Sequence, residues 1–254
     1  AAIQKQANAI VISAINSQGV IPSLERAKQA GITVINFDTR IADPGLARAF
    51  VGADDVAGAY KAGKYICQKL QGKGEVALLE GLLEQSPGVD RKAGFLNAIK
   101  ECPEIKVVAS VSAAWRTDLA RDATANILAA HPNIKGMFAC NDQMAIGMVE
   151  GVKAAGKDPK DLVLVGYDGI LEAAQLVLGG ELDAFVALPT REEGQMGVRL
   201  AVASLLNPTF TFPREIIVPG PLVTKTYEAG LTDDTIDEYL ARVYPLMGVT
   251  PTGY

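Results

Sequence analysis

Polar side chains recur at the points where apolar segments of this sequence end. In "GMFACNDQMAIG" (136–147) the apolar run stops at Asn141 and Asp142, and a helical pattern of apolar residues follows. An amide or carboxylate at such a join either caps the helix or contacts a bound molecule. The residues that follow the other apolar runs are Ser13 with Asn16, Asp38 with Arg40, Asp54 with Asp55, Glu80 with Glu84, Trp115, and Tyr167 with Asp168.

A ligand explains some of these residues better than helix capping does. Capping alone accounts for Asp54, Asp55 and Asp142 as well as a ligand would, because Asp is preferred at helix starts. It accounts less well for Asp38, which a loop follows, and not at all for Trp115. A second chemistry, acid–base catalysis by a carboxylate pair such as Asp38 with Asp168 across a cleft, also stays open at this point.

Motifs of the common enzyme classes are mostly absent. Gly72 and Gly74 precede an apolar run, whereas a phosphate-binding loop must follow a strand and open a helix. There is no G-x-S-x-G sequence, and a single histidine, His131, makes a Ser-His-Asp or Cys-His arrangement improbable. We therefore expect a protein that is not an enzyme.

The composition is that of a globular protein without metal or nucleic-acid sites. The 254 residues are 49% hydrophobic and 21% charged, with a net charge of −5, which argues against a nucleic-acid surface. No apolar run reaches membrane-spanning length. One histidine cannot complete a typical zinc site, and we expect no metal and no cofactor. The three cysteines are expected to be buried small side chains, although one pair could form a disulfide.

Apolar strands alternate with helical patterns almost to the end of the chain. The predicted strands are 9–13, 32–37, 48–54, 75–80, 105–111, 136–139, 162–167 and 183–188. The predicted helices are 21–30, 55–70, 88–100, 118–130, 142–155, 171–178 and 191–206. Continuous apolar strands separated by single helices indicate α/β doubly wound parallel sheets, which bind ligands beyond the carboxyl ends of their strands.

The chain resembles the type I periplasmic sugar-binding proteins, in particular the ribose-binding branch, which is related to the effector domains of lac-repressor-type regulators. The resemblance covers almost the whole chain. It rests on "GITVINFDTR", "FVGADDVAGAYKAGKYI", "DRKAGF", "AAHPNIKGMFACNDQMAIG" and "LVLVGYDG", of which the last two are the most specific.

The resemblance implies two parallel-sheet lobes joined by a three-strand hinge, with the ligand in the cleft between them. Residues 1–54 and 188–218 would form the N-terminal lobe, and 55–187 the C-terminal lobe. Residues 219–254 would form the hinge return and a tail, with an extra helix capped by Thr232. Relatives begin about fifty residues earlier, on the order of one and a half βα units. The first lobe would therefore lack its first βα units and expose apolar sheet.

The resemblance also implies a set of ligand-binding residues. Hydroxyl groups of a sugar would meet carboxylates that accept, guanidinium groups that donate and an asparagine that does both, and an aromatic ring would cover the sugar's apolar side. Asn141 would point into the cleft, while Asp142 would cap the helix. The expected ligand-binding residues are Ser13, Asp38, Arg40, Arg91, Trp115, Asn141 and Asp168.

Alternative interpretations remain for several of these residues. Trp115 could belong to the core, Arg91 could hold its own loop, and Asp168 could cap the next helix. Arg40 lies one residue further from Asp38 than in the ribose-binding pattern. Ala187 also replaces a glutamine of that pattern, so the specific sugar or polyol stays open.

The implied function is that of a solute receptor for a sugar or polyol ABC importer, which traps a small carbohydrate by hinge closure and catalyses no reaction. Its partners would be that ligand and a membrane ABC permease, with no nucleic acid, and the full-length protein would be a monomer. The location would be periplasmic or extracellular, which is also compatible with a lipid anchor. The alternative is the sugar-binding effector domain of a lac-repressor-type transcription regulator.

Overall fold

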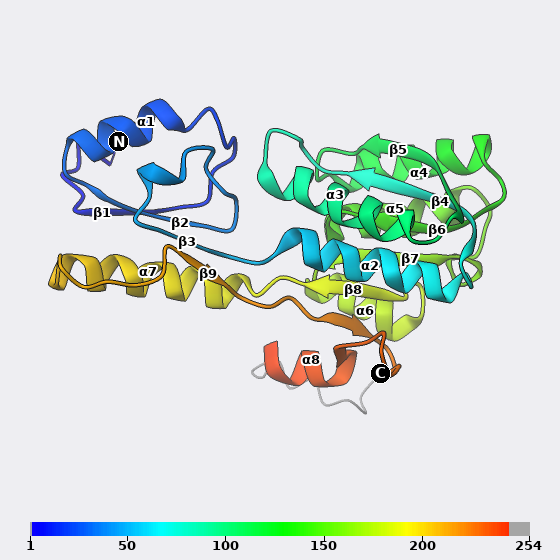
Figure 1. The fold of residues 1–254 in the computed structure, drawn as a ribbon. Helices are drawn as coiled ribbons and strands as arrows, with labels where there is room; N and C mark the ends of the chain where they lie inside the picture. Colours follow the sequence, from blue (N-terminus) through cyan, green and yellow to red (C-terminus); the bar gives the residue numbers. More distant parts are fainter. Residues whose placement is uncertain (1, 244–254) are drawn as a thin grey trace. The chain divides into compact units, whose positions relative to one another are not determined.

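The computed structural model describes residues 2–243 and divides into two compact units (Figure 1). Unit 1 comprises Ala1–Asp54, Leu83–Val89 and Pro189–Pro219. Unit 2 comprises Asp55–Leu82, Asp90–Leu188 and Gly220–Tyr254. The end of the predicted tail, 244–254, lies outside the described residues.

Unit 1 is built on a four-stranded parallel sheet. Its strands are β1 (Ala9–Ile12), β2 (Thr33–Phe37), β3 (Ala49–Gly52) and β9 (Glu215–Ile217), in the order β1-β2-β3-β9. Neighbouring β2 residues point to opposite faces of the sheet, so Val34 packs with Leu24 of α1 (Ile21–Gln29), whereas Ile35 packs with Leu200 of α7 (Thr190–Leu206). One small hydrophobic cluster therefore lies on each face of this sheet.

One side of unit 1 leaves apolar surface uncovered. All four residues of the edge strand β1 are only partly buried, although the strand is apolar. Along α7, Val198, Val202, Leu205 and Leu206 are exposed at helical spacing. These features agree with the expectation of an incomplete first sheet with exposed apolar residues.

Unit 2 is built on a larger sheet with the strand order β11-β10-β8-β7-β6-β4-β5. All pairs are parallel except β10 with β8, which are antiparallel. The strands are β4 (Lys73–Glu80), β5 (Glu104–Ser112), β6 (Ile134–Ala139), β7 (Val163–Asp168), β8 (Ala184–Ala187), β10 (Leu222–Thr224) and β11 (Asp234–Thr235). The prediction of an α/β fold with two parallel sheets is confirmed.

Helices cover both faces of the unit 2 sheet. Successive β4 residues 76–79 point alternately to the two faces, and all four are fully buried. These residues belong to a single large hydrophobic core. The helices are α2 (Asp55–Lys69), α3 (Ser86–Lys100, whose first turn is assigned to unit 1), α4 (Thr117–Ala130), α5 (Asp142–Ala154), α6 (Leu171–Gly179) and α8 (Ile236–Val243). None of the helices among residues 2–243 combines the length and apolar character that crossing a bilayer requires.

A disulfide bond joins Cys67 of α2 to Cys102, which lies between α3 and β5. The expectation that the cysteines are simply buried side chains is therefore wrong for this pair, and the alternative of one bridge is realised. Cys140 is buried and free. Burial raises the pKa of its thiol to about 12, so the group stays protonated and unreactive at neutral pH.

The last described segment packs onto unit 2 and ends in α8. The prediction that Thr232 caps this helix is wrong, because the Thr232 hydroxyl accepts from the Thr224 hydroxyl and from the Glu228 N–H, which both precede the helix. The helix begins instead after Thr235, whose hydroxyl accepts from the Glu238 N–H, while the Glu238 carboxylate accepts from the Thr235 N–H. This reciprocal arrangement is a capping box.

Candidate functional site

The unit 1 residues Ser13 and Asp38 are brought together at the carboxyl ends of β1 and β2. Ser13 Oγ donates to Asp38 Oδ2 at 2.7 Å, and Thr39 Oγ1 donates to the same oxygen at 3.1 Å. Asp38 has a left-handed backbone with a φ of 56°. Within residues 2–243 no donor lies on Asp38 Oδ1, so this oxygen can accept a hydrogen bond from a ligand.

A buried asparagine shapes the loop that carries Asp38. Asn36 Nδ2 donates to the carbonyl oxygens of Ile12 and Thr39 at 3.0 and 2.8 Å, and its Oδ1 accepts from the Ile41 N–H at 3.1 Å. The sequence interpretation missed this residue. The available signal was a lone polar side chain inside the apolar run "ITVINF".

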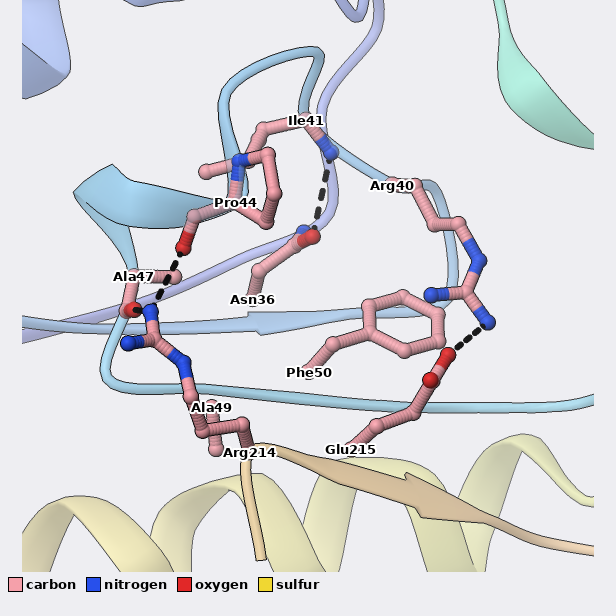
Figure 2. Close-up of a pocket in the computed structure, with 9 residues that line it drawn as sticks. All are labelled: Asn36, Arg40, Ile41, Pro44, Ala47, Ala49, Phe50, Arg214 and Glu215. Atoms are coloured by element: carbon pink, nitrogen blue, oxygen red, sulfur yellow. Dashed lines mark hydrogen bonds and ion pairs between the residues drawn. The ribbon is translucent and has the colours of Figure 1, made fainter.

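Arg40 lies in the wall of a cavity of about 370 Å³ in unit 1, shown in Figure 2. Its guanidinium carbon is 3.8 Å from the centroid of the Phe50 ring, and it forms an ion pair with Glu215. Across the cavity, Arg214 donates to the carbonyl oxygens of Pro44 and Ala47. The charged partner of Arg40 in unit 1 is therefore Glu215.

In unit 2, Arg91 joins three elements through charged hydrogen bonds. Its Nε donates to Asp55 Oδ1, and its Nη1 donates both to the Cys140 carbonyl and to Asp168 Oδ1, each at 2.8 Å. The guanidinium carbon lies 3.9 Å from the centroid of the Tyr167 ring. Only 3% of Arg91 is exposed. Arg91 lies in α3 and not in a loop, and it cross-links three other parts of unit 2 instead of holding its own loop.

Arg91 stays charged in this buried position. Burial by itself lowers the pKa of its guanidinium, but the carboxylates of Asp55 and Asp168 outweigh burial and raise the pKa well above its ordinary value. In the described part of the chain, Nη2 has no hydrogen-bond partner. A preorganised cation with an unused NH2 group is thus available to a ligand oxygen.

The roles predicted for Asn141 and Asp142 are partly exchanged. Asn141 is the N-cap of α5, because its Oδ1 accepts from the Met144 N–H at 2.9 Å. The prediction that Asp142 caps this helix is wrong, since Asp142 Oδ2 accepts from the N–H groups of Gly169 and Ile170. The Asn141 Nδ2 donates to no other residue between 2 and 243, so Asn141 can cap the helix and still donate to a ligand.

Asp168 and Trp115 both lie near Arg91. Asp168 ends β7, its side chain is 26% exposed, and its φ is 115°. It does not cap α6, whose N-cap is Ile170. Trp115 is partly buried against the core, and its ring lies across Gly81, where a Cβ would collide with it. The Arg91 guanidinium carbon is 5.8 Å from this ring.

A family model described as a periplasmic binding protein domain matches residues 1–208. The chain belongs to this family. This periplasmic binding protein domain is 37% identical to the D-allose-binding periplasmic protein of Escherichia coli K12, over 78% of the chain and 66% of that protein. It is 30% identical to the ribose import binding protein of Bacillus subtilis 168, over 92% of the chain and 70% of that protein. The chain thus spans about two thirds of the length of these relatives.

Solved structures of periplasmic binding proteins share the fold. An ABC transporter periplasmic solute-binding protein from Actinobacillus succinogenes 130z with bound D-allose has a TM-score of 0.82 and 34% identity, covering 88% of this chain and 79% of that chain. A Caulobacter myo-inositol-binding protein has a TM-score of 0.83 and 25% identity, covering 88% and 76%. The resemblance to the type I sugar-binding proteins is confirmed.

Proposed function

We propose that this chain is the solute receptor of a sugar or polyol ABC importer, which binds a small carbohydrate without transforming it. The relatives support this proposal, because their names and titles include binding proteins for D-allose, ribose, D-apiose and myo-inositol. The observation that carries it is the buried, charged Arg91, which bonds to Asp168, lies near the Trp115 ring and has no partner on Nη2 among the described residues.

Each proposed binding residue has a distinct role. Asp38, oriented by Ser13, would accept from one sugar hydroxyl, and Asp168 from another. Arg91 Nη2 and Asn141 Nδ2 would donate to ring or hydroxyl oxygens. These charge-assisted hydrogen bonds are roughly twice as strong as neutral ones.

Two further residues complete the proposed set. Trp115 would cover the apolar face of the sugar, because its ring is already held against Gly81 and loses little freedom on binding. Arg40 would contribute only by exchanging Glu215 for a ligand oxygen.

The partners and location follow from the same proposal. A receptor of this class would deliver its ligand to a membrane ABC permease and act in the periplasm or outside the cell. A disulfide such as Cys67–Cys102 is typical of those oxidising compartments. Hinge closure and a monomeric full-length protein remain predictions.

Isothermal titration of the folded protein with D-allose, D-ribose, D-apiose, L-arabinose and myo-inositol tests the proposal. We expect one stereochemical class to bind, and Asp168→Asn to weaken that binding by about 1–3 kcal/mol, as for a lost buried hydrogen bond. The matched control is Asp161→Asn, at an exposed carboxylate of η2 (Pro159–Asp161). A folded wild-type protein that binds no member of the panel would contradict the proposed function.

A further inference from the structure

The peptide groups of Gly169 are held from two sides within unit 2. The Gly169 N–H donates to Asp142 Oδ2 at 2.6 Å, and the Ile170 N–H donates to the same oxygen at 2.9 Å. On the other side, the Gly169 carbonyl accepts from Tyr239 Oη at 2.5 Å. Asp142 belongs to α5 and Tyr239 to α8, so two helices far apart in sequence contact one turn.

This turn has an unusual backbone conformation. Asp168 has a φ of 115° and Gly169 a φ of 81°, both in a region that residues with a side chain rarely adopt. A non-glycine residue persists in that region only when its surroundings determine the backbone strongly. The bonds from Asp142 and Tyr239 to the adjacent peptide groups supply this constraint.

The two groups that hold the turn are themselves immobilised in the core. Asp142 is fully buried, and Tyr239 is 4% exposed with its ring edge-on to Phe185 at 5.2 Å between centroids. A Cβ added at Gly169 would collide with Tyr239 Oη. Asp142 and Tyr239 together form a clamp on this turn, and their burial leaves the clamp little freedom to adjust. The turn that it holds carries the side chain of Asp168.

Helix capping does not account for Asp142, because Asn141 provides the cap of α5. Among the described residues, Asp142 Oδ1 has no hydrogen-bond partner, which makes the burial of this carboxyl group unfavourable. Its two hydrogen bonds to the turn after Asp168 run through Oδ2, and the backbone N–H of Tyr167, in the strand that leads into the turn, also favours the charged carboxylate. A costly buried group that contacts the backbone of this segment indicates a role in holding the turn.

We infer that Asp142 and Tyr239 are positioning residues, which clamp Gly169 and thereby fix the Asp168 carboxylate against Arg91 for ligand binding. The inference rests on the proposed function, because the ligand that Asp168 meets is the proposed sugar. It also gives α8 a part in recognition, although α8 itself supplies no ligand-binding residue.

The first test compares Tyr239→Phe with Tyr60→Phe. Each variant removes one tyrosine hydroxyl and keeps the ring; the control hydroxyl donates to Glu101 at 2.7 Å, away from the turn. With the sugar that the wild-type protein binds in the panel, we expect Tyr239→Phe to lower affinity about tenfold, the factor that corresponds to one hydrogen bond. We expect Tyr60→Phe to leave affinity unchanged. Equal affinities in Tyr239→Phe and the wild type would overturn the role of Tyr239.

A double-mutant cycle separates positioning from a general structural effect. If Tyr239 acts through Asp168, the loss caused by Tyr239→Phe should disappear in an Asp168→Asn background. A loss of the same size in both backgrounds would show that Tyr239 does not act through Asp168. For Asp142, we expect Asn to retain affinity, because an amide oxygen can accept the same two N–H groups, and Ala to lower it. Equal affinities in the Asn and Ala variants would remove Asp142 from the clamp.

A third readout needs no sugar and so distinguishes failure of this inference from failure of the proposed function. In NMR spectra of the labelled protein, Tyr239→Phe should shift the amide resonances of Asp168 and Gly169 and the Nε–H resonance of Arg91. Tyr60→Phe should leave all three in place. Unchanged resonances in Tyr239→Phe would overturn the clamp whether or not any sugar binds.

Discussion

Arg91 Nη1 donates to Asp168 Oδ1 at 2.8 Å and so joins α3 to the carboxyl end of β7. The same guanidinium also neutralises Asp55, which is nearly as buried as Arg91 itself. Two carboxylates thus depend on one cation that is almost completely buried.

Removal of this cation should be strongly destabilising. We expect Arg91→Leu to lower the free energy of unfolding by about 3–5 kcal/mol, the usual cost of leaving a buried charge without its partner. Urea unfolding of the purified variant measures this. Arg121→Leu is the control, because Arg121 pairs with Asp122 on the surface and should contribute no more than about 1 kcal/mol. Similar losses in the two variants would contradict the structural role of Arg91.

Substitutions of Asn141 should separate helix capping from ligand binding. Asn141→Ala removes both functions, so we expect a loss of about 1 kcal/mol in stability and of about 1–3 kcal/mol in sugar affinity. Asn141→Ser keeps a capping oxygen but is too short to replace the Nδ2 donor. Stability should therefore largely recover while affinity does not. Full affinity in Asn141→Ala would remove Asn141 from the proposed site.

The Cys67–Cys102 disulfide should contribute measurably to the stability of unit 2. We expect Cys102→Ser to lower the free energy of unfolding by about 2–4 kcal/mol. Denaturation with and without a reductant measures the same quantity in the wild-type protein. The reductant should have no effect on the variant, and a thiol count on the unfolded wild-type protein should find Cys140 alone. Three reactive thiols in that count would contradict the bridge.

Asp142 should make stability depend on pH. Burial and then the nearby Asp168 raise the pKa of the Asp142 carboxyl well above its ordinary value, against the N–H groups of Gly169 and Ile170, which lower it. The folded state therefore holds this proton more tightly than the unfolded state. The resulting stabilisation is fully present below the unfolded pKa and is lost as pH rises through the folded pKa.

Asp142→Asn removes this titration and provides the comparison. The wild-type protein should lose stability relative to the variant as pH rises above the ordinary aspartate range. Chemical denaturation at a series of pH values measures the difference between the two. A difference that is independent of pH would contradict the raised pKa.

The pair of Arg40 and Glu215 tests how far the proposed site extends. Both side chains are partly exposed, so Glu215→Gln should cost less than about 1 kcal/mol in stability. If Arg40 exchanges Glu215 for a ligand oxygen, this variant should keep or increase sugar affinity, while Arg40→Ala decreases it. Unchanged sugar affinity in Arg40→Ala would show that Arg40 lines the unit 1 cavity but does not bind the ligand.

The sequence was sufficient for β1 to β8, the α-helices and the parallel sheets, because a buried parallel strand must be a continuous apolar run, but it did not predict the short strands β9, β10 and β11. It also indicated the polar residues at strand ends, including Asp38 and Asp168. The sequence could not assign the hydrogen-bond partners of these side chains, because the partners depend on distances between segments that are remote in the chain. Asn141 and Asp142 are adjacent, and only the position of the turn at Gly169 shows which of them caps the helix.

Other features of the structure could not be predicted from the sequence for the same reason. Tyr239 lies in a segment that the sequence assigned to a tail, and its contact with Gly169 spans 70 residues. The Cys67–Cys102 bridge spans 35 residues and has no recognisable spacing motif. Asn36 could not be found from the sequence because its partners include the Ile12 carbonyl, 24 residues away, and backbone groups of the loop after its strand.

The unequal cores of the two units have a consequence for calorimetry. Unit 2 has one large core and a covalent crosslink, whereas unit 1 divides its few buried residues between two small clusters beside an uncovered edge strand. Small cores bury a smaller fraction of their surface and are only marginally stable. Heating should therefore melt unit 1 first, giving a low-temperature endotherm before the main one, so that no single melting temperature describes this chain.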